Sequence, residues 1–170
     1  DGRRQLLDYQ KTVDDKIVYI LRRMAIYIEL EDKTDYTGSC FDELDAMLVN
    51  LKKEALRYMN NHLITEDDYY YEYMQMRARQ CVILKRIYAD IIRLTTTPEQ
   101  GKALADFIRQ TADEFAEQNN VETLLSELER LHRYYEQQRL PVTRQEFENR
   151  SMLYHILEDM KAFLDIKKDF

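Results

Sequence analysis

The chain has 170 residues, of which 45% are apolar and 34% are charged, and it contains only three glycines and two prolines. Because sheets need turn-forming residues at short intervals, this composition argues against all-β and α/β folds and indicates one helical domain with a buried core. The formal net charge of −7 argues against nucleic acid as a partner, since phosphate binding needs a basic face.

Two helices are predicted in the first sixty residues. Apolar side chains recur at three- and four-residue steps over residues 3–30, and the pattern breaks over residues 31–38. A second helix is predicted from Ser39, with apolar positions at the seven-residue intervals typical of bundle packing: Phe41, Leu44, Leu48, Leu51, Ala55 and Tyr58. The longest apolar run of the first helix is interrupted by Arg22 and Arg23, so no segment approaches the ~20 apolar residues that span a bilayer.

A third helix is predicted to begin at Thr65, within the segment TEDDYYYEYMQMRARQ at residues 65–80. Its acids, residues 66–68, would occupy the first turn, where the helix dipole favours negative charge, so they indicate no metal. Two apolar stripes about 100° apart follow, which predicts a central helix buried over a wide face. The first stripe comprises Tyr69, Tyr73, Met76, Gln80, Ile83, Ile87, Ile91 and Leu94, and the second comprises Tyr70, Met74, Arg77, Cys81, Leu84, Tyr88 and Ile92.

Three further helices are predicted in the second half of the chain. Thr97 and Pro98 mark the start of one, Val121 to Tyr135 form the next, and Thr143 with Glu146 forms a capping box for the last, which runs to about residue 167. The predicted fold is an all-α antiparallel bundle of about five or six helices, with residues 1–170 forming a single helical domain.

The sequence offers little chemistry. Glu129-x-x-His132 is half of a di-metal motif, but no second pair exists and Glu129 lies off the apolar stripe, so no metal or other cofactor is predicted. His155 is expected to pair with Glu158 and Asp159 on its own helix. Cys40 and Cys81 lack metal-ligand spacing and are expected to be free thiols. The sequence therefore predicts a protein that is not an enzyme.

One arc of the third helix is the candidate ligand site. Tyr69, Tyr73, Arg77 and Gln80 place polar groups inside an apolar surface, and such groups need partners when buried. In one interpretation the tyrosines stack on a small aromatic molecule while Arg77 pairs with its carboxylate. In the other, Arg77 pairs with an acid on the next helix and the arc is ordinary core.

The last helix carries a family resemblance. LPVTRQEFENRSMLYHILEDMKAFLDIK, residues 140–167, resembles the closing signature of the C-terminal domain of the bacterial putative aromatic acid exporter family. The positions that fit the signature are Leu140, Pro141, Thr143, Arg144, Glu146, Phe147, Glu148 and Arg150. The resemblance implies the C-terminal part of a longer membrane protein, lying at the cytoplasmic face of a bacterial membrane, and transfers no functional residue. The basic first helix would then lie nearest the membrane.

Two functions stay open on this evidence. The domain is a non-catalytic accessory module that senses aromatic acids or gates their export, or it is an oligomerisation or protein-interaction domain without a small-molecule ligand. The partners expected are the membrane-spanning part of the same chain, further copies of the chain in a homo-oligomer and a small aromatic acid.

Overall fold

The predicted apolar stripes do form helices that bury their apolar faces. In a computed structural model that describes residues 2–61, 69–95, 98–115 and 121–170, the described residues form six α-helices and no strand. The helices are α1 (Gly2–Glu29), α2 (Ser39–Asn61), α3 (Tyr69–Ile91), α4 (Pro98–Asp113), α5 (Val121–Glu136) and α6 (Arg144–Lys168). The all-α prediction is confirmed. Thr65, the three acids after it and Thr97 lie outside the described residues.

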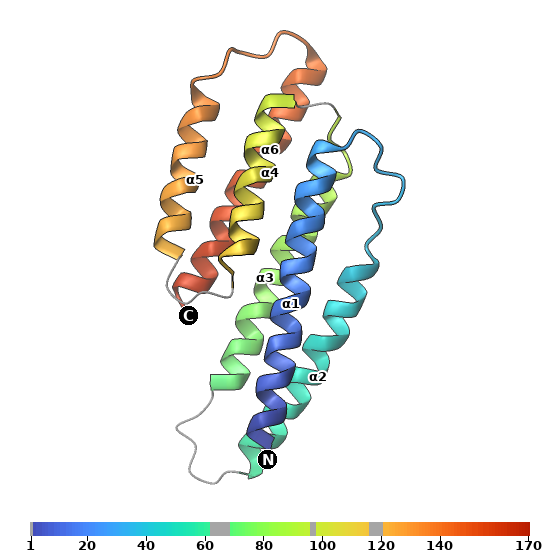
Figure 1. Cartoon of the computed structure of the whole chain (residues 1–170), viewed down its shortest axis with the longest axis vertical. Helices are drawn as coiled ribbons and strands as arrows, with labels where there is room; N and C mark the ends of the chain where they lie inside the picture. Colours follow the sequence, from blue (N-terminus) through green and yellow to red (C-terminus); the bar gives the residue numbers. More distant parts are fainter. Residues whose placement is uncertain (1, 62–68, 96–97, 116–120) are drawn as a thin grey trace.

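The helices form two groups that share α1 and α3 (Figure 1). α2 packs on α1 and α3, whereas α4 packs on α1, α6 packs on α3, and α5 covers α4 and α6 from outside. The second group covers only the C-terminal parts of α1 and α3, so α4 and α6 both end near the middle of the long axis. The candidate site residues Arg77 and Gln80 of α3 lie at this height, beside Phe115 just beyond α4 and Phe163 of α6.

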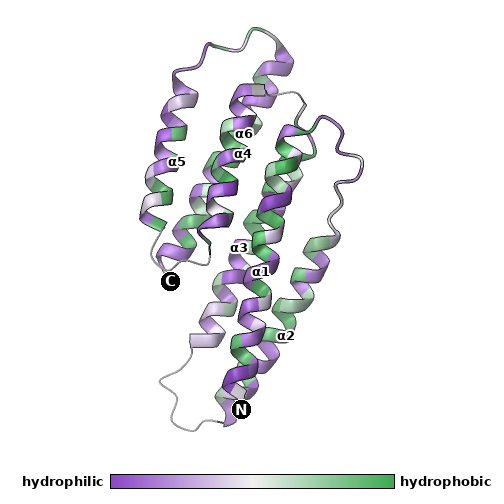
Figure 2. Cartoon of the chain, in the orientation of Figure 1, coloured by the Kyte–Doolittle hydropathy of each residue, from purple (hydrophilic) through white to green (hydrophobic). Residues whose placement is uncertain are grey.

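Burial follows the predicted periodicity. The inward helix faces are apolar and the outward faces are polar, as the hydropathy colouring shows (Figure 2). On α3 the buried positions cover a wide arc: Tyr70, Tyr73, Met74, Met76, Arg77, Gln80, Cys81, Ile83, Leu84, Ile87 and Ile91. α3 is therefore central, as its two stripes predicted, and it shares this position with α1; Tyr69 and Ile92 of the predicted stripes are exposed. No described helix combines the length and the apolar character that a membrane crossing requires.

The capping box predicted for α6 is present. The Thr143 hydroxyl accepts a hydrogen bond from the Glu146 amide at 3.1 Å, and the Glu146 carboxylate accepts one from the Val142 amide at 2.8 Å. The first bond pairs an amide that the start of a helix leaves without a partner. The second fixes the chain just before the Thr143 cap. The same connection leaves three large apolar side chains, Leu140, Val142 and Phe147, exposed.

Candidate functional site

Tyr73, Arg77 and Gln80 come together in the structure, one helical turn apart on the buried side of α3. Arg77 is only 3% exposed and Gln80 is fully buried. A helix presents residues three and four apart on one face, which is why these three side chains are neighbours. With Asp14 of α1 they form what we call the Arg77 cluster (Asp14, Tyr73, Arg77 and Gln80).

Hydrogen bonds join the Arg77 cluster across three helices. Arg77 Nε donates to Asp14 Oδ1 at 2.9 Å and lies 3.0 Å from the Tyr73 hydroxyl, which itself donates to Asp14. Arg77 Nη1 donates to Gln80 Oε1 at 2.7 Å. Gln80 Nε2 in turn donates to the backbone oxygen of Phe163 on α6, at 2.9 Å. The network therefore links α1, α3 and α6 through groups that would be costly to bury unpaired.

Two aromatic rings sandwich the Arg77 guanidinium. Its central carbon lies 4.5 Å from the ring centre of Phe115, just beyond α4, and 4.9 Å from that of Tyr73. Both rings lie within the range in which a cation is attracted to the aromatic face. Residues at the ends of α4 and α6 thus cover the Arg77 side chain of α3.

Charges of both signs surround this guanidinium. The Asp14 side chain is 32% exposed, so the counter-ion of Arg77 is in partial contact with solvent. Burial lowers the pKa of Lys167, and the charge of Arg77 lowers it further, while Asp14 opposes the change. Burial also raises the pKa of the Tyr73 phenol well above its ordinary value, which keeps it a hydrogen-bond donor. One carboxylate oxygen of Glu114 is buried without a hydrogen-bond partner beside Arg77 and Lys167.

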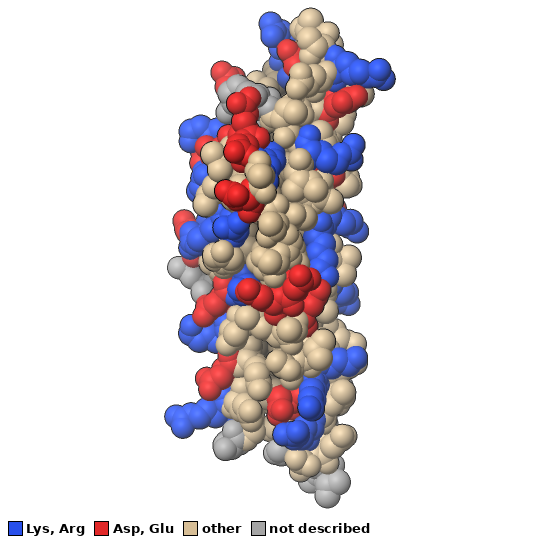
Figure 3. Space-filling model, turned by 90° about the vertical axis from the view of Figure 1, so that its right-hand side faces the viewer, with Lys and Arg blue, Asp and Glu red and all other residues tan. Residues whose placement is uncertain are grey.

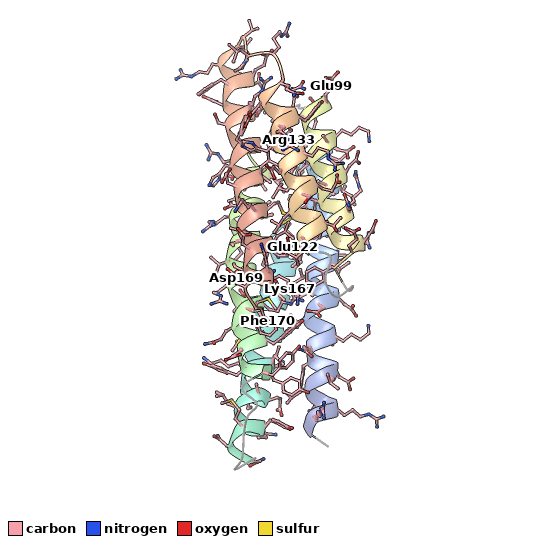
Figure 4. All side chains as sticks on the ribbon, turned by 90° about the vertical axis from the view of Figure 1, so that its left-hand side faces the viewer. Glu99, Glu122, Arg133, Lys167, Asp169 and Phe170 are labelled. Atoms are coloured by element: carbon pink, nitrogen blue, oxygen red, sulfur yellow. The ribbon has the colours of Figure 1, made fainter. Side chains whose placement is uncertain are left out.

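Tyr69 lies at the edge of this site and is 45% exposed. Its ring centre is 6.2 Å from that of Tyr73 and 5.7 Å from that of Phe170, which also lies 6.0 Å from Tyr73. Figure 4 shows Lys167, Asp169 and Phe170 together where α6 ends, near the middle of the molecule. The last residues of the chain therefore occupy the aromatic surface that Tyr69 and Tyr73 offer.

The free space beside Arg77 is small. A cavity of about 20 Å³ adjoins Arg77 and Gln80 and is walled by Glu114, Phe115 and Phe163 among others. A volume of this size holds about one water molecule. An aromatic acid can reach Arg77 only if side chains move. Larger hollows lie elsewhere: one of about 570 Å³ is an open groove between α5 and α6 with Leu125, Leu128 and Leu157 among its walls.

The other candidate residues lie apart from the Arg77 cluster. Glu129 is exposed and pairs with Arg133, and His132 pairs with Glu136 at 2.9 Å, so these two form ordinary helix-surface pairs. Cys40 and Cys81 are buried free thiols. Burial raises the pKa of Cys81 to about 12, which makes it a poor nucleophile.

His155 has a partner that sequence reasoning missed. Its Nδ1 lies 2.5 Å from Asp90 Oδ2 on α3 and 4.0 Å from Asp159 Oδ2 on its own helix. The predicted contact with Asp159 is therefore the longer of the two, and Asp90 was not predicted. The hydrogen bond with Asp90 raises the pKa of His155, and burial opposes this change. Asp90 and His155 are far apart in sequence, so only the α3–α6 register could reveal the pair.

One face of the surface carries charges of both signs (Figure 3). Lysines and arginines are interspersed with aspartates and glutamates on the face shown in Figure 3, and acidic side chains gather near its middle. A phosphate backbone needs a continuous basic strip.

Fold and site together define an all-α helical domain whose buried polar residues hold helices together. A family model described as "Putative aromatic acid exporter C-terminal domain" matches residues 3–168, and the chain belongs to this family. The resemblance noted in the last helix thus extends over nearly the whole chain.

The chain is similar to a curated bacterial protein and to a solved structure. The uncharacterized protein YqjA of Bacillus subtilis (strain 168) is 30% identical over 167 residues, which cover 98% of this chain and 52% of that protein. The chain thus spans about half the length of this relative. The crystal structure of a putative membrane protein from Clostridium difficile 630 superimposes with a TM-score of 0.81 at 28% identity, covering 96% of this chain and 97% of that one.

Proposed function

We infer that this domain is a non-catalytic accessory domain on the cytoplasmic side of a bacterial membrane exporter, and that it senses aromatic acids at the Arg77 cluster. Membership of the exporter family supports the setting, and the free thiols Cys40 and Cys81 fit a reducing compartment. Because α1 and α3 contribute to both groups of helices, we also infer that residues 1–170 act as a single unit.

The observation that carries this function is the partly exposed counter-ion of a buried arginine. Arg77 brings a buried guanidinium, a cationic group that needs an anion when it is removed from water. Asp14 supplies one from a position that solvent reaches. A ligand carboxylate can take its place on the guanidinium, because Asp14 regains hydration when it turns outward.

The aromatic part of the ligand has a place beside this carboxylate. Phe170 now covers Tyr69 and Tyr73 from the end of α6 and is itself 39% exposed. An aromatic ring that displaces Phe170 would keep the same ring contacts with both tyrosines. The small volume beside Arg77 makes this displacement necessary, so binding is coupled to a movement of the α6 end. That movement is the signal available to a membrane-spanning part of the same chain.

Isothermal titration of the purified domain with benzoate tests this function. Benzoate should bind, whereas cyclohexanecarboxylate, which has the charge without the aromatic ring, should bind more weakly. Arg77→Met should abolish binding, and circular dichroism should confirm that this variant is folded. Arg133→Met, which removes an exposed arginine of α5, is the matched control and should bind as the native chain does. No heat with millimolar benzoate, or unchanged binding by Arg77→Met, contradicts the function.

Self-association is the second candidate function. Leu140, Val142 and Phe147 are 81%, 75% and 60% exposed and lie within eight residues of one another at the start of α6. Apolar side chains gathered in this way are typical of association surfaces. Light scattering should then give a mass above 20.6 kDa that falls to the monomer value in Phe147→Ser. A native chain that is monomeric at high concentration contradicts this alternative.

A further inference from the structure

We propose that Asp90, His155 and Asp159 form a binding site for a divalent transition-metal ion, with Zn²⁺ as the ion that fits best. The three residues join the C-terminal part of α3 to the middle of α6, helices that pack side by side (Figure 1). This site is separate from the Arg77 cluster and does not depend on the function inferred above.

The donor atoms converge. One ligand atom from each of the three residues lies within 4.8 Å of the other two. His155 Nδ1 is 2.5 Å from Asp90 Oδ2 and 4.0 Å from Asp159 Oδ2. Ligand atoms on a tetrahedral zinc ion lie about 3.3 Å apart, given bond lengths of about 2.0 Å. Shifts of less than about 1 Å would therefore bring both distances to the required value.

Asp159 provides an independent observation that points to a cation. The residue is only 4% exposed, and its Oδ2 is buried without a hydrogen-bond partner. Its Oδ1 accepts a hydrogen bond from Arg86 Nη2 at 2.8 Å, so the Arg86 pair leaves Oδ2 pointing towards His155. A buried carboxylate oxygen without a partner is costly, and a cation placed between it and His155 removes that cost.

The kinds of donor select the ion. One imidazole nitrogen with two carboxylate oxygens suits Zn²⁺ and related transition metals, whereas Mg²⁺ and Ca²⁺ prefer oxygen ligands alone. Arg86, whose Nη2 donates to Asp159 Oδ1, would hold Asp159 in place and leave only Oδ2 to bind the ion. The His155 side chain is 57% exposed, so water can fill a fourth coordination position. The ion would act as a clip between α3 and α6.

Zinc titration of the tag-free protein, after treatment with a chelator, tests the site. Calorimetry should show one Zn²⁺ per chain, with Mg²⁺ giving no comparable heat. His155→Ala should weaken binding by about 100-fold and Asp159→Asn by about tenfold or more, since both remove a ligand atom. His155 is exposed, so its replacement leaves the fold intact. Bound Co²⁺ should show visible absorption bands that His155→Ala removes.

His132→Ala is the matched control, because it removes a second exposed histidine that also lies beside a carboxylate. It should bind Zn²⁺ as the native chain does. The proposal is overturned if micromolar Zn²⁺ fails to bind, if His155→Ala binds with native affinity, or if His132→Ala is the variant that loses binding.

Discussion

Two ionic sites on α3 handle buried charge in opposite ways. Near the middle of the molecule, the Arg77 cation is buried, and its Nε and Nη1 atoms contact Asp14, Tyr73 and Gln80. The second site lies at Asp90, thirteen residues or about 20 Å further along α3. There the buried charge belongs to Asp159 of α6, one of whose oxygens is buried without a hydrogen-bond partner.

In the first site each of the four cluster side chains is hydrogen-bonded to another, and we call this site closed, although one buried oxygen of Glu114 beside it has no partner. Its network fixes how three helices pack. In the second site Arg86 pairs with one oxygen of Asp159 and the other oxygen has no hydrogen-bond partner, so we call this site open. It retains the capacity to bind a cation.

The difference follows from what each helix contributes. α1 brings Asp14 to Arg77 with the opposite charge, so the pair is neutral. At the other site α3 brings Asp90 to a place where α6 already carries Asp159, and the positive charges are Arg86 and, when protonated, His155. Removing one partner of the buried Arg77 pair would leave an uncompensated charge and lower the stability. At the other site, a bound cation would supply positive charge and raise the stability.

The largest effect is expected from Asp14→Ala, which breaks the closed site. Arg77 would remain buried without its anion, so the free energy of unfolding should fall by about 3 kcal/mol. Urea denaturation followed by circular dichroism measures this change. The matched control is Asp15→Ala, which removes an exposed neighbouring acid that pairs only with Lys11, and which should change stability by less than about 0.5 kcal/mol. Equal losses in the two variants would show that Arg77 does not depend on Asp14.

Zinc is expected to give the next largest effect, at the open site. At a free concentration a hundredfold above its dissociation constant, Zn²⁺ should raise the free energy of unfolding by about 2.7 kcal/mol. Thermal or urea unfolding with zinc and with a chelator gives the difference. In Asp159→Asn, which should bind at least tenfold more weakly, the gain at the same zinc concentration should fall to about 1.4 kcal/mol or less. If that variant gains as much as the native chain, the ion binds elsewhere on the surface.

Thr143→Ala provides a local reference for these two effects, since it alters a helix cap and no buried charge. The loss of the bond from the Glu146 amide should lower the free energy of unfolding by about 1 kcal/mol. Ser151→Ala, at an exposed position inside α6, should be nearly neutral in the same urea experiment. A cap variant as stable as the Ser151 variant would mean that the box adds nothing.

The smallest expected effect is the titration of Glu146. Its pKa is lowered, chiefly by the hydrogen bond from the Val142 amide. The stabilisation is therefore complete above the pKa of the unfolded chain and is lost as the pH falls through the lower pKa of the folded chain. The amide resonance of Val142 should titrate with a midpoint below the ordinary range of glutamate. A midpoint within or above that range would show that the bond does not favour the carboxylate.

The sequence predicted features that depend on neighbours along the chain. The cap formed by Thr143 and Glu146 and the shared face of Tyr73, Arg77 and Gln80 follow from helical periodicity alone. The sequence also predicts, as one of two alternatives, that Arg77 pairs with an acid on the next helix; in the structure the acid is Asp14 of α1.

The partners across helices could not be predicted. Asp14 meets Arg77, and Asp90 meets His155, through the register between helices, which side-chain packing sets. Periodicity defines a face of each helix but not the height at which two faces meet. For the same reason Tyr69 was grouped with the buried face, although the structure leaves it at the edge beside Phe170.

Fluorine NMR of a chain labelled at the Phe170 ring tests most directly whether a ligand acts at Arg77 by displacing the end of α6. During a benzoate titration the resonance should move towards that of a solvent-exposed ring and saturate with the calorimetric affinity, and Arg77→Met should abolish the change. A Phe170 resonance that stays in place while benzoate saturates the protein would contradict the account.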